Sequence, residues 1–525
     1  MVLSAYKKIN SNGFVQSVRL VFVILVVSSC GESTYQNPVI PGDFPDPSVI
    51  RVDDTYYAVG TSSEWGPHYP IYTSTDLVNW DRKGYIFDEM PEWTSGSYWA
   101  PELFYYNGLF YVYYTARRKS DNISVIGVAT ADDPAEGFTD HGILVEWGNE
   151  AIDAFAFLDD DGELYMSWKA YGLVPDKPIT LYANAMEPDG LSLRGEAFVL
   201  IEEQNGGIEG QAIVKKNDFY YLFYAAKGCC GRTCDYQVEV ARSENIRGPW
   251  ERNPANPILH EGEDWRCPGH GTPVINSEGR YFYLYHSYHA NDFVYTGRQG
   301  LLDELVWRDD GWPAFKHGTT PSVEAPAPYT TTQQKKVTQF FENFENEKLS
   351  SFWQYDFRNE PDKQVNNGKL HLIVTKEAAT SPSGAFLGIA PKRGDYILTT
   401  TVVNEGDNQT GIAAYGDASN SLQFAVNGDR LFVEKVQDDE LDTIFHESIP
   451  YENKIHLKMI VEDGYKYQFF WSLDENNWNN ISVQAGSVID GSYLPPWDRA
   501  VRAGLVVAGA EGDKGVFDDF RIDYP

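Results

Sequence analysis

Five side chains that can do chemistry share one position in a repeated segment of the sequence. Trp99, Asp153, Glu209 and His270 stand 12 residues before the last residue of a Tyr-rich segment, and Asp46 stands 11 residues before one. Glycoside hydrolysis uses such a set, because one carboxylic acid protonates the leaving oxygen while a carboxylate activates water. A third carboxylate beside the acid raises the pKa of the acid, since neighbouring anions repel each other. The alternative for each acid alone is a solvated turn residue or a hydrogen-bonding group of the core.

Aromatic residues and charge narrow the class of ligand. The chain contains 14 Trp, 34 Tyr and 28 Phe. Aromatic rings stack on sugar faces, and Trp65 and Trp99 are the candidates for such a wall. The formal net charge of -34 disfavours nucleic acids and anionic membrane surfaces as partners, and it is compatible with a neutral sugar chain. The alternative is that the acidity only keeps an exported protein soluble.

The Tyr-rich segments recur five times, and each follows a turn residue and leads into a further strand. Their last residues are Tyr57, Tyr111, Tyr165, Tyr221 and Phe282, which are separated by 54, 54, 56 and 61 positions. Several short strands per unit, at a period of about fifty residues, are typical of β-propeller blades. We therefore predict a five-bladed β-propeller over residues 31–320, in which equivalent positions converge on the central axis. A two-sheet sandwich is the alternative fold, but it does not explain so regular a spacing.

A second β-rich region follows the repeats. Prolines and a Thr/Gln run make residues 321–338 a polar linker. Residues 339–525 alternate between apolar and polar positions, for example at 369–374, without the repeat of the first region. Asn427-Gly428 between two such segments predicts a hairpin. The predicted fold is all-β, a five-bladed β-propeller followed by an antiparallel β-sandwich.

The first 30 residues have the features of an export signal. Lys7 and Lys8 precede an apolar stretch at residues 20–27 that is too short to span a bilayer. The stretch leads into Val27-Ser28-Ser29-Cys30-Gly31, which resembles a bacterial lipobox, where small residues precede a Cys that becomes lipidated. We therefore predict a lipoprotein signal peptide over residues 1–30 and a periplasmic or cell-surface protein that touches the membrane only through a lipid on Cys30. An ordinary signal peptide with a chance cysteine is the alternative.

Four further cysteines remain after Cys30. They are Cys229, Cys230, Cys234 and Cys267. An exported compartment allows disulfides, and four cysteines permit three pairings that the sequence does not distinguish. No His accompanies them at zinc-finger spacing, so structural bridging is favoured over a zinc site.

Several motifs resemble those of glycoside hydrolase family 43. They are the segments 37–48 (NPVIPGDFPDPS), 98–102 (YWAPE), 152–153 (ID), 209–210 (EG) and 307–313 (WRDDGWP), which match the family in order and spacing. Segment 516–522 resembles part of the concanavalin A-like sandwich that many exo-acting members carry. The resemblance implies that Asp46 is the general base, Glu209 the general acid, and Asp153 the residue that tunes and orients the acid. It also implies that Arg298 binds substrate hydroxyls, for which a surface arginine in a hairpin is the alternative.

By this resemblance the chain is expected to release terminal α-L-arabinofuranosyl or β-D-xylosyl units from plant hemicellulose or pectin by inverting hydrolysis. No cofactor is expected for the chemistry. An endo-1,5-α-L-arabinanase is one alternative, and a surface carbohydrate-binding propeller without activity is another. Ala154 replaces the usual Pro and Gln211 the usual Pro or Ala, which bears on substrate preference.

The resemblance also implies a structural calcium ion near His270. One imidazole is a poor calcium site alone, so waters or carbonyl groups have to supply the other ligands. The alternative is that His270 only forms hydrogen bonds at the floor of the site.

Overall fold

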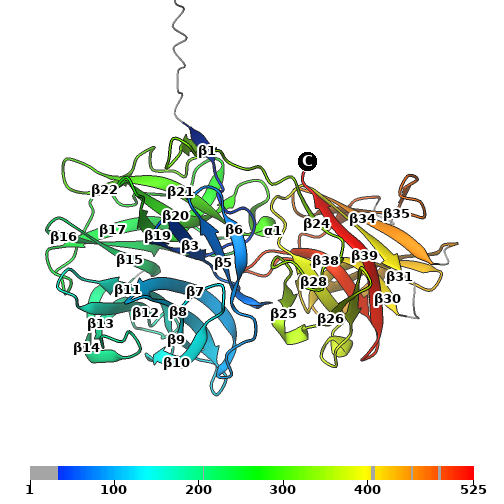
Figure 1. Cartoon of the computed structure of the whole chain (residues 1–525), viewed down its shortest axis with the longest axis horizontal. Helices are drawn as coiled ribbons and strands as arrows, with labels where there is room; N and C mark the ends of the chain where they lie inside the picture. The colour runs from blue at the N-terminus through cyan, green and yellow to red at the C-terminus, as the bar shows by residue number, and fades with distance from the viewer. Residues whose placement is uncertain (1–32, 205, 404–407, 451–452, 483–485) are drawn as a thin grey trace, which may run out of the picture. The chain divides into compact units, whose positions relative to one another are not determined.

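The computed structural model describes residues 33–525, apart from residue 205 and the segments 404–407, 451–452 and 483–485 (Figure 1). The predicted signal peptide and the predicted lipid anchor at Cys30 fall on residues 1–32 and lie outside the described residues. Residues 33–525 form one compact unit. Within the described ranges, no helix has the length and apolar character of a transmembrane span.

The first part of the described chain contains five four-stranded antiparallel sheets, one for each Tyr-rich segment (Figure 1). The first two sheets consist of β2 (Ser48–Val52), β3 (Thr55–Val59), β5 (His68–Ser74) and β6 (Asp81–Phe87), and of β7 (Thr94–Tyr106), β8 (Leu109–Arg118), β9 (Ser124–Ala131) and β10 (Thr139–Val145). The third consists of β11 (Ala151–Leu158), β12 (Leu164–Ala170), β13 (Ile179–Met186) and β14 (Leu193–Glu203). The last two consist of β15 (Ile208–Lys216), β16 (Phe219–Ala226), β17 (Gln237–Ser243) and β18 (Glu251–Arg252), and of β19 (Trp265–Ile275), β20 (Tyr281–His289), β21 (Arg298–Trp307) and β22 (Pro313–Phe315).

The first strands of the five sheets form a closed ring. Strand β2 contacts β7, β7 contacts β11, β11 contacts β15, β15 contacts β19, and β19 contacts β2. A ring of inner strands with further strands outside each of them is the architecture of a propeller. The predicted propeller is therefore confirmed, and the five sheets agree with the five predicted blades.

The Tyr-rich segments form the second strand of each blade, and their side chains fill the spaces between blades. In one core cluster, Tyr221 and Phe223 of β16 pack with Tyr283 and Tyr285 of β20. Both faces of a blade are covered by its neighbours, so aromatic side chains are buried on both faces of these strands. Burial of this aromatic area is the main driving force for assembling the ring.

The N-terminal segment packs against the last blade of the ring and against the connector that follows it. Strand β1 (Thr34–Gln36) pairs with β23 (Glu324–Pro326). The Asn37 side chain accepts a hydrogen bond of 2.9 Å from the Leu302 N–H and donates one of 3.0 Å to the Leu302 carbonyl oxygen in β21. The Phe44 N–H donates to the Arg298 carbonyl oxygen at 2.7 Å, which holds the chain just before Asp46 against the fifth blade. Arg298 follows the one-turn helix α1 (Phe293–Thr296).

The second part of the chain is a β-sandwich, as predicted. In the described residues, one sheet has nine strands: β24 (Gln339–Glu342), β26 (Asp362–Asn366), β27 (Lys369–Ile373), β29 (Tyr396–Val403), β34 (Lys454–Glu462), β35 (Lys466–Ser472), β36 (Asn479–Asn480), β37 (Ile489–Asp490) and β39 (Lys514–Asp523). The other has six: β28 (Ala385–Ile389), β30 (Gln409–Asp417), β31 (Asn420–Asn427), β32 (Arg430–Gln437), β33 (Glu440–Ser448) and β38 (Arg502–Ala508). Two short 3-10 helices, η1 (Phe357–Asn359) and η2 (Ala378–Thr380), lie in its connections.

The alternating pattern of the second region is explained by its packing. Leu422 and Phe424 of β31 lie in one core cluster with Leu457 and Phe469 of the facing sheet. The predicted hairpin is confirmed, because β31 and β32 pair up to Asn427 and Arg430 across a two-residue turn. Glycine is favoured in this turn, since Gly428 has a φ of 56°.

The sandwich is joined to the propeller by a strand pair. Strand β25 (Tyr355–Asp356) of the second region pairs with β4 (Trp65–Gly66) of the first. Trp65 lies in a cluster with Phe386, Tyr415 and Val506 of the sandwich. The second region therefore covers a part of the first blade.

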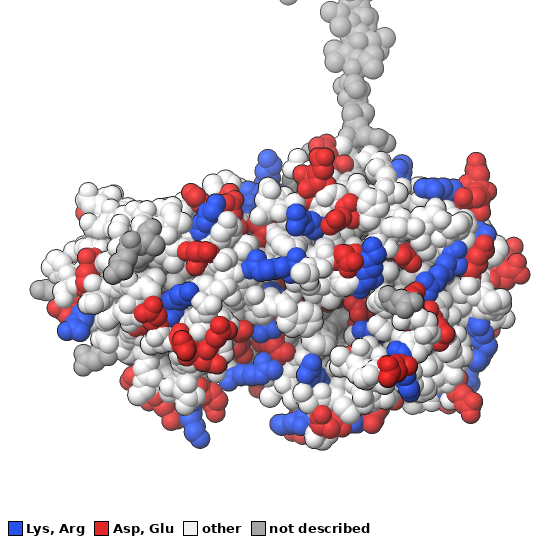
Figure 2. Space-filling view, turned by 180° about the vertical axis from the view of Figure 1, so that it is seen from behind, with Lys and Arg blue, Asp and Glu red and all other residues white. Residues whose placement is uncertain are grey.

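Charged side chains are mixed over the surface that Figure 2 presents, where acidic and basic groups alternate. Nucleic acids bind where cations are concentrated along one face. The net charge of -34 and this mixed surface are compatible with the neutral ligand that the sequence predicts.

Candidate active site

Asp46 is held by contacts on both of its carboxylate oxygens. It precedes β2 with a φ of 51°, in the left-handed region. Its Oδ1 lies 2.9 Å from Nη1 of Arg298 and 3.2 Å from Nδ1 of His286. Its Oδ2 accepts a hydrogen bond of 2.7 Å from the Thr61 hydroxyl. Asp46 is 7% exposed and Arg298 is 3% exposed, so this ion pair is buried.

The surroundings keep Asp46 ionised. Burial by itself raises the pKa of Asp46, because a poorly solvated site disfavours charge. The charge of the Arg298 guanidinium outweighs burial and holds the pKa well below its usual range. Burial lowers the pKa of His286 to about 4, so its ring is neutral at neutral pH and its Nδ1 accepts the Asp46 N–H at 3.0 Å. Asp46 is thus available as a proton acceptor at neutral pH.

Asp153 connects the third blade to the fourth. It lies in β11 with a φ of 58°. Its Oδ2 accepts a hydrogen bond of 2.9 Å from the N–H of Gly210, the residue after Glu209. Its own N–H donates to the Thr115 hydroxyl at 3.2 Å, and the Gln211 side-chain amide donates to its carbonyl oxygen. Asp153 therefore fixes the backbone that carries Glu209.

Glu209 accepts hydrogen bonds on both oxygens. Lys169 Nζ donates to Oε2 at 3.0 Å, and the Tyr236 hydroxyl donates to Oε1 at 2.9 Å. Lys169 also lies 3.1 Å from Oε1 of Glu150. The side chain of Glu209 is 17% exposed, compared with 9% for Asp46 and 6% for Asp153. Of these three carboxylates, Glu209 is therefore the most accessible to a ligand.

The pKa values of Asp153 and Glu209 move apart. Burial raises the pKa of Asp153, and the negative charge of Glu209 raises it further. The charge of His270 acts to lower this pKa, but it does not outweigh burial. Burial also acts to raise the pKa of Glu209, but the Lys169 cation and the hydrogen bonds from Lys169 and Tyr236 outweigh it and lower that pKa. A proton shared by the pair therefore resides on Asp153 more than on Glu209. This corrects the expectation that a neighbouring carboxylate raises the pKa of Glu209, because Lys169 has the larger effect.

His270 lies between two of the carboxylates. Its Nδ1 is 3.4 Å from Oδ1 of Asp46 and 3.9 Å from Oδ2 of Asp153. Calcium needs six to eight oxygen ligands. Among the described residues, no three or more His, Cys, Asp or Glu side chains are grouped so that they could hold a metal ion. A calcium ion held by His270 together with waters or carbonyl groups therefore stays a prediction, and no step below involves a metal.

The two predicted aromatic residues differ in position. Trp99 is partly exposed, and its ring lies 6.3 Å from the ring of Trp497, which comes from the sandwich. Trp65 is only 1% exposed, and the guanidinium of Arg502 lies 4.7 Å from its ring. A ring buried among sandwich residues has no face for a sugar. Contrary to the prediction, Trp65 therefore belongs to the contact between propeller and sandwich, and only Trp99 stays a candidate for stacking.

Each inner strand has an irregular backbone where its site residue stands. The left-handed residues are Asp46 (φ 51°), Ala100 (φ 41°), Asp153 (φ 58°), Gly210 (φ 58°) and His270 (φ 36°). Register shifts interrupt the pairing of β7, β11, β15 and β19 at the same places. Such bulges re-aim side chains, and non-glycine residues with positive φ cost roughly 1–3 kcal/mol each. Left-handed backbone at the equivalent position, or one residue after it, in all five blades indicates a functional site.

A second register of the repeat holds the partners of the carboxylates, and sequence reasoning missed it. The residues four positions after the ends of the Tyr-rich segments are Thr61, Thr115, Lys169, Ala225 and His286. Thr61 and His286 contact Asp46. Thr115 accepts the N–H of Asp153, and Lys169 pairs with Glu209. Polar residues at a fixed offset in four of five apolar strands were the signal that could have identified them.

The sandwich also reaches the site. Arg298 donates from Nη2 to the carbonyl oxygen of Asp498 at 3.1 Å. The Asp498 carboxylate accepts a hydrogen bond of 2.7 Å from the Ser63 hydroxyl and pairs with Arg499 at 2.7 Å. Asp498 is 3% exposed. The sandwich segment around Asp498 thus helps to hold the arginine that pairs with Asp46.

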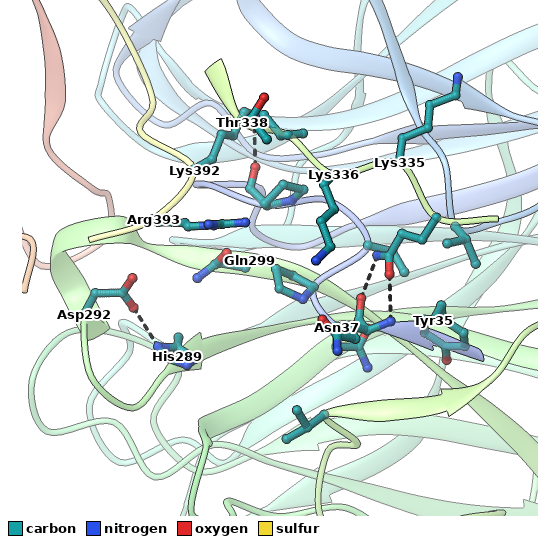
Figure 3. A pocket seen from close by; sticks show the side chains of 18 of the residues that line it. Tyr35, Asn37, His289, Asp292, Gln299, Lys335, Lys336, Thr338, Lys392 and Arg393 are labelled. Atoms are coloured by element: carbon teal, nitrogen blue, oxygen red, sulfur yellow. Dashed lines mark hydrogen bonds and ion pairs between the residues drawn. The ribbon is translucent and has the colours of Figure 1, made fainter. Parts of the chain in front are cut away.

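A separate cavity of about 1100 Å³ is not lined by Asp46, Asp153 or Glu209 (Figure 3). It is lined by the N-terminal segment, the connector and a loop of the sandwich. Lys392 Nζ in its wall donates to the Pro41 carbonyl oxygen at 3.0 Å. Asp292 accepts the Gly394 N–H at 2.7 Å and lies 3.1 Å from His289. These polar groups join parts of the chain to each other, so they do not need a ligand.

Two family models match the chain. Residues 35–313 match the model of glycosyl hydrolases family 43, and residues 342–497 match the model of the beta xylosidase C-terminal concanavalin A-like domain. The first match spans the blades that carry the carboxylates, and the second spans most of the sandwich.

Individual relatives agree with these matches. A xylan 1,3-beta-xylosidase of a Vibrio species is 30% identical over 326 residues, which are 56% of this chain and 60% of that enzyme. The extracellular exo-alpha-(1->5)-L-arabinofuranosidase ArbA of Cellvibrio japonicus is 30% identical over 308 residues, which are 52% of this chain and 86% of that enzyme. The crystal structure of the GH43 BlXynB protein from Bacillus licheniformis has a TM-score of 0.79 at 24% identity, over 94% of this chain and 100% of that chain. The last comparison shows that the fold is shared.

Proposed function

Because the chain belongs to glycosyl hydrolase family 43, we propose that it releases terminal α-L-arabinofuranosyl or β-D-xylosyl units from plant glycans by inverting hydrolysis. The observation that carries this proposal is the group of Asp46, Asp153 and Glu209, joined through His270 and Gly210 on the ring of inner strands. Members of the family need no cofactor for the reaction.

In this proposal Asp46 is the general base. Its ionised carboxylate takes a proton from water, and the water oxygen attacks the anomeric carbon from the face opposite the leaving group. Arg298 and Thr61 hold the carboxylate in one orientation. Binding of a sugar hydroxyl by Arg298 stays a prediction, because its Nε, which has no partner among the described residues, is buried.

Glu209 is the general acid and gives its proton to the glycosidic oxygen. The sugar displaces water from Glu209, the carboxylate with the most exposure, and loss of water raises its pKa. Asp153 keeps the Gly210 amide in place. Its raised pKa lets it hold the proton of the pair in the free site, and this proton moves to Glu209 when the bound sugar raises the pKa of Glu209.

The alkaline limb of the pH–rate profile is expected to move to higher pH when Lys169 is replaced by Met. Against the raising effect of burial, the Lys169 cation lowers the pKa of Glu209. Removal of the cation therefore raises this pKa, and the acid stays protonated to higher pH. We expect a movement of roughly one to three pH units in kcat/KM, the range typical of a nearby opposite charge.

The matched control for this change is Lys215→Met, because Lys215 pairs with Asp159 and Asp160 and not with a site carboxylate. Its profile should coincide with that of the unaltered protein. A folded Lys169→Met protein with an unmoved alkaline limb would contradict the assignment of Glu209 as the acid.

The proposal includes exo action, which means that the released sugar is the terminal unit of the chain. Relatives include a xylosidase and an exo-acting arabinofuranosidase. Trp497 and Asp498 of the sandwich lie against Trp99 and Arg298, and this limits the space beside the carboxylates. Nitrophenyl arabinofuranoside, xyloside and galactoside, tested beside linear and branched arabinan, identify the sugar. Monosaccharide alone from linear arabinan supports exo action, mixed oligomers support an endo-arabinanase, and binding without turnover supports a carbohydrate-binding protein.

We further propose that the protein is an exported lipoprotein. The apolar stretch at residues 20–27 before Cys30 supports this, and so do the disulfides Cys229–Cys230 and Cys234–Cys267, which persist in oxidising compartments. In a bacterial host, Cys30→Ala should move the protein from the membrane fraction to the soluble fraction. An unchanged distribution would contradict the lipid anchor.

A further inference from the structure

The loop between β16 and β17 begins and ends beside Glu209. Its first residue, Lys227, donates its N–H to the Gly207 carbonyl oxygen at 2.8 Å, two residues before Glu209. Its last residue, Tyr236, donates to the Glu209 carboxylate at 2.9 Å. The loop therefore stands next to the proposed acid.

The loop contains a disulfide between two neighbouring residues. Cys229 is bonded to Cys230, while Cys234 is bonded to Cys267 in β19. A disulfide stabilises a protein by restricting the unfolded chain, and the effect grows with the length of the loop that it closes. Cys234–Cys267 has a sequence separation of 33 and can act in this way, whereas Cys229–Cys230 has a separation of 1. As a crosslink, the Cys229–Cys230 disulfide therefore contributes little to stability.

The same loop touches the exposed tryptophan of the sandwich. A Cβ placed on Gly231, the residue after Cys230, would lie 3.3 Å from the Trp497 carbonyl oxygen. Arg232 donates to the Ser492 carbonyl oxygen, which fixes the loop to the sandwich. Trp497 is 60% exposed, although a tryptophan of this size is normally covered. Cys229 and Cys230 are also partly exposed.

We propose that the Cys229–Cys230 ring and Trp497 bind the sugar on the leaving-group side of the bond that is cut. This inference rests on the proposed function. The acid protonates the oxygen of the leaving sugar, so that sugar lies on the Glu209 side of the site. The disulfide loop begins and ends beside Glu209 and contacts Trp497, so both groups are placed to meet that sugar.

The chemistry of both groups suits an uncharged pentose. The C–H face of a sugar packs on the ring of a tryptophan. Sulfur is polarisable and packs well against apolar surface, and two joined sulfurs with their methylene groups present a small flat patch without charge. The site would take the next sugar of a neutral chain and would gain nothing from a charged leaving group.

The test compares substrates that have a leaving sugar with substrates that have none. Xylobiose and α-1,5-linked arabinobiose carry such a sugar, whereas xylosyl fluoride and arabinofuranosyl fluoride do not. We expect Trp497→Ala to lower kcat/KM for the disaccharide about tenfold more than for the matching fluoride, because binding energy of the remote sugar is lost only from the disaccharide. The double change Cys229→Ser with Cys230→Ser should give the same selective loss and leaves Cys234–Cys267 in place.

Phe341→Ala is the control, since Phe341 is an aromatic residue of the sandwich that is 52% exposed and belongs to β24. It should change neither substrate class. Equal losses on disaccharide and fluoride in both variants, or no loss on either, would overturn the inference and leave the proposed function intact. Failure of the unaltered protein to cleave any of the four substrates would overturn the proposed function itself.

Discussion

Glu209→Gln is expected to abolish the turnover of natural glycosides and to spare glycosyl fluorides. Glutamine has the size of glutamate and can keep a contact with Tyr236, but it has no proton to give to the glycosidic oxygen. General acid catalysis contributes roughly 10²–10⁴ in rate, so kcat on xylobiose or arabinobiose should fall by about that factor. Fluoride leaves without protonation, so hydrolysis of the matching glycosyl fluoride should fall far less. Steady-state kinetics on each pair of substrates measures the difference.

Glu304→Gln is the matched control for Glu209→Gln. Glu304 is 7% exposed and pairs with Arg280 and Lys316, so the change also removes a buried carboxylate with cationic partners. It should leave the ratio of the two rates unchanged. A Glu209→Gln protein that loses the same factor on disaccharide and fluoride would show that Glu209 does not act as the acid.

Asp46→Asn is expected to remove activity on every substrate, fluorides included. The water must lose a proton whichever group departs, and an amide cannot accept that proton. The loss of general base catalysis should be roughly 10²–10⁴ in kcat. The change also leaves the Arg298 cation without its charged partner, and breaking a buried ion pair costs about 3–5 kcal/mol. Thermal unfolding should therefore be followed beside the kinetics, to confirm that the variant is folded.

A buried aspartate outside the site controls for this loss. Asp303 is 3% exposed and accepts hydrogen bonds from Tyr285 and Ser322. Asp303→Asn should lower stability without selective loss of turnover. A folded Asp46→Asn protein with near-normal rates on the fluoride would refute the assignment of Asp46 as the base.

The propeller and the meeting of its carboxylates could be predicted from the sequence because the repeat is regular. Tyr57, Tyr111 and Tyr165 mark equivalent places, and an offset of 11 or 12 residues from them leads to Asp46 and to the inner strands of the next blades. Equivalent positions in blades converge on one axis, so the offset alone brings the acids together. The roles of the individual carboxylates remain predictions that the variants above test.

The electrostatics of the site could not be predicted from that register alone. The pKa of Glu209 is lowered because Lys169 lies 3.0 Å away, and Lys169 belongs to a different strand from the one that carries Glu209. Likewise, His286 and Thr61 contact the Asp46 carboxylate from positions that look like ordinary strand residues. Distances between blades depend on packing, which the spacing of motifs does not determine.

Contacts between distant parts of the chain were also beyond sequence reasoning. Trp65 was predicted to face a sugar, yet a strand pair with Tyr355 and Asp356 places it under the sandwich. Asp498 reaches Arg298 across 200 residues of sequence. The pairing Cys229–Cys230 was one of three that the sequence left open. The positions of Trp65 and Asp498 depend on how the two regions dock, whereas the pairing of Cys229 with Cys230 depends on the conformation of one loop.

Inversion at the anomeric carbon is the central claim, and the anomer first released by the enzyme tests it most directly. Proton NMR during early turnover of a β-xyloside should show α-xylose before mutarotation, and an α-arabinofuranoside should give the β-anomer. This result is expected when water, activated by Asp46, attacks opposite the bond that Glu209 protonates. Initial release of the anomer with the configuration of the substrate would contradict the account.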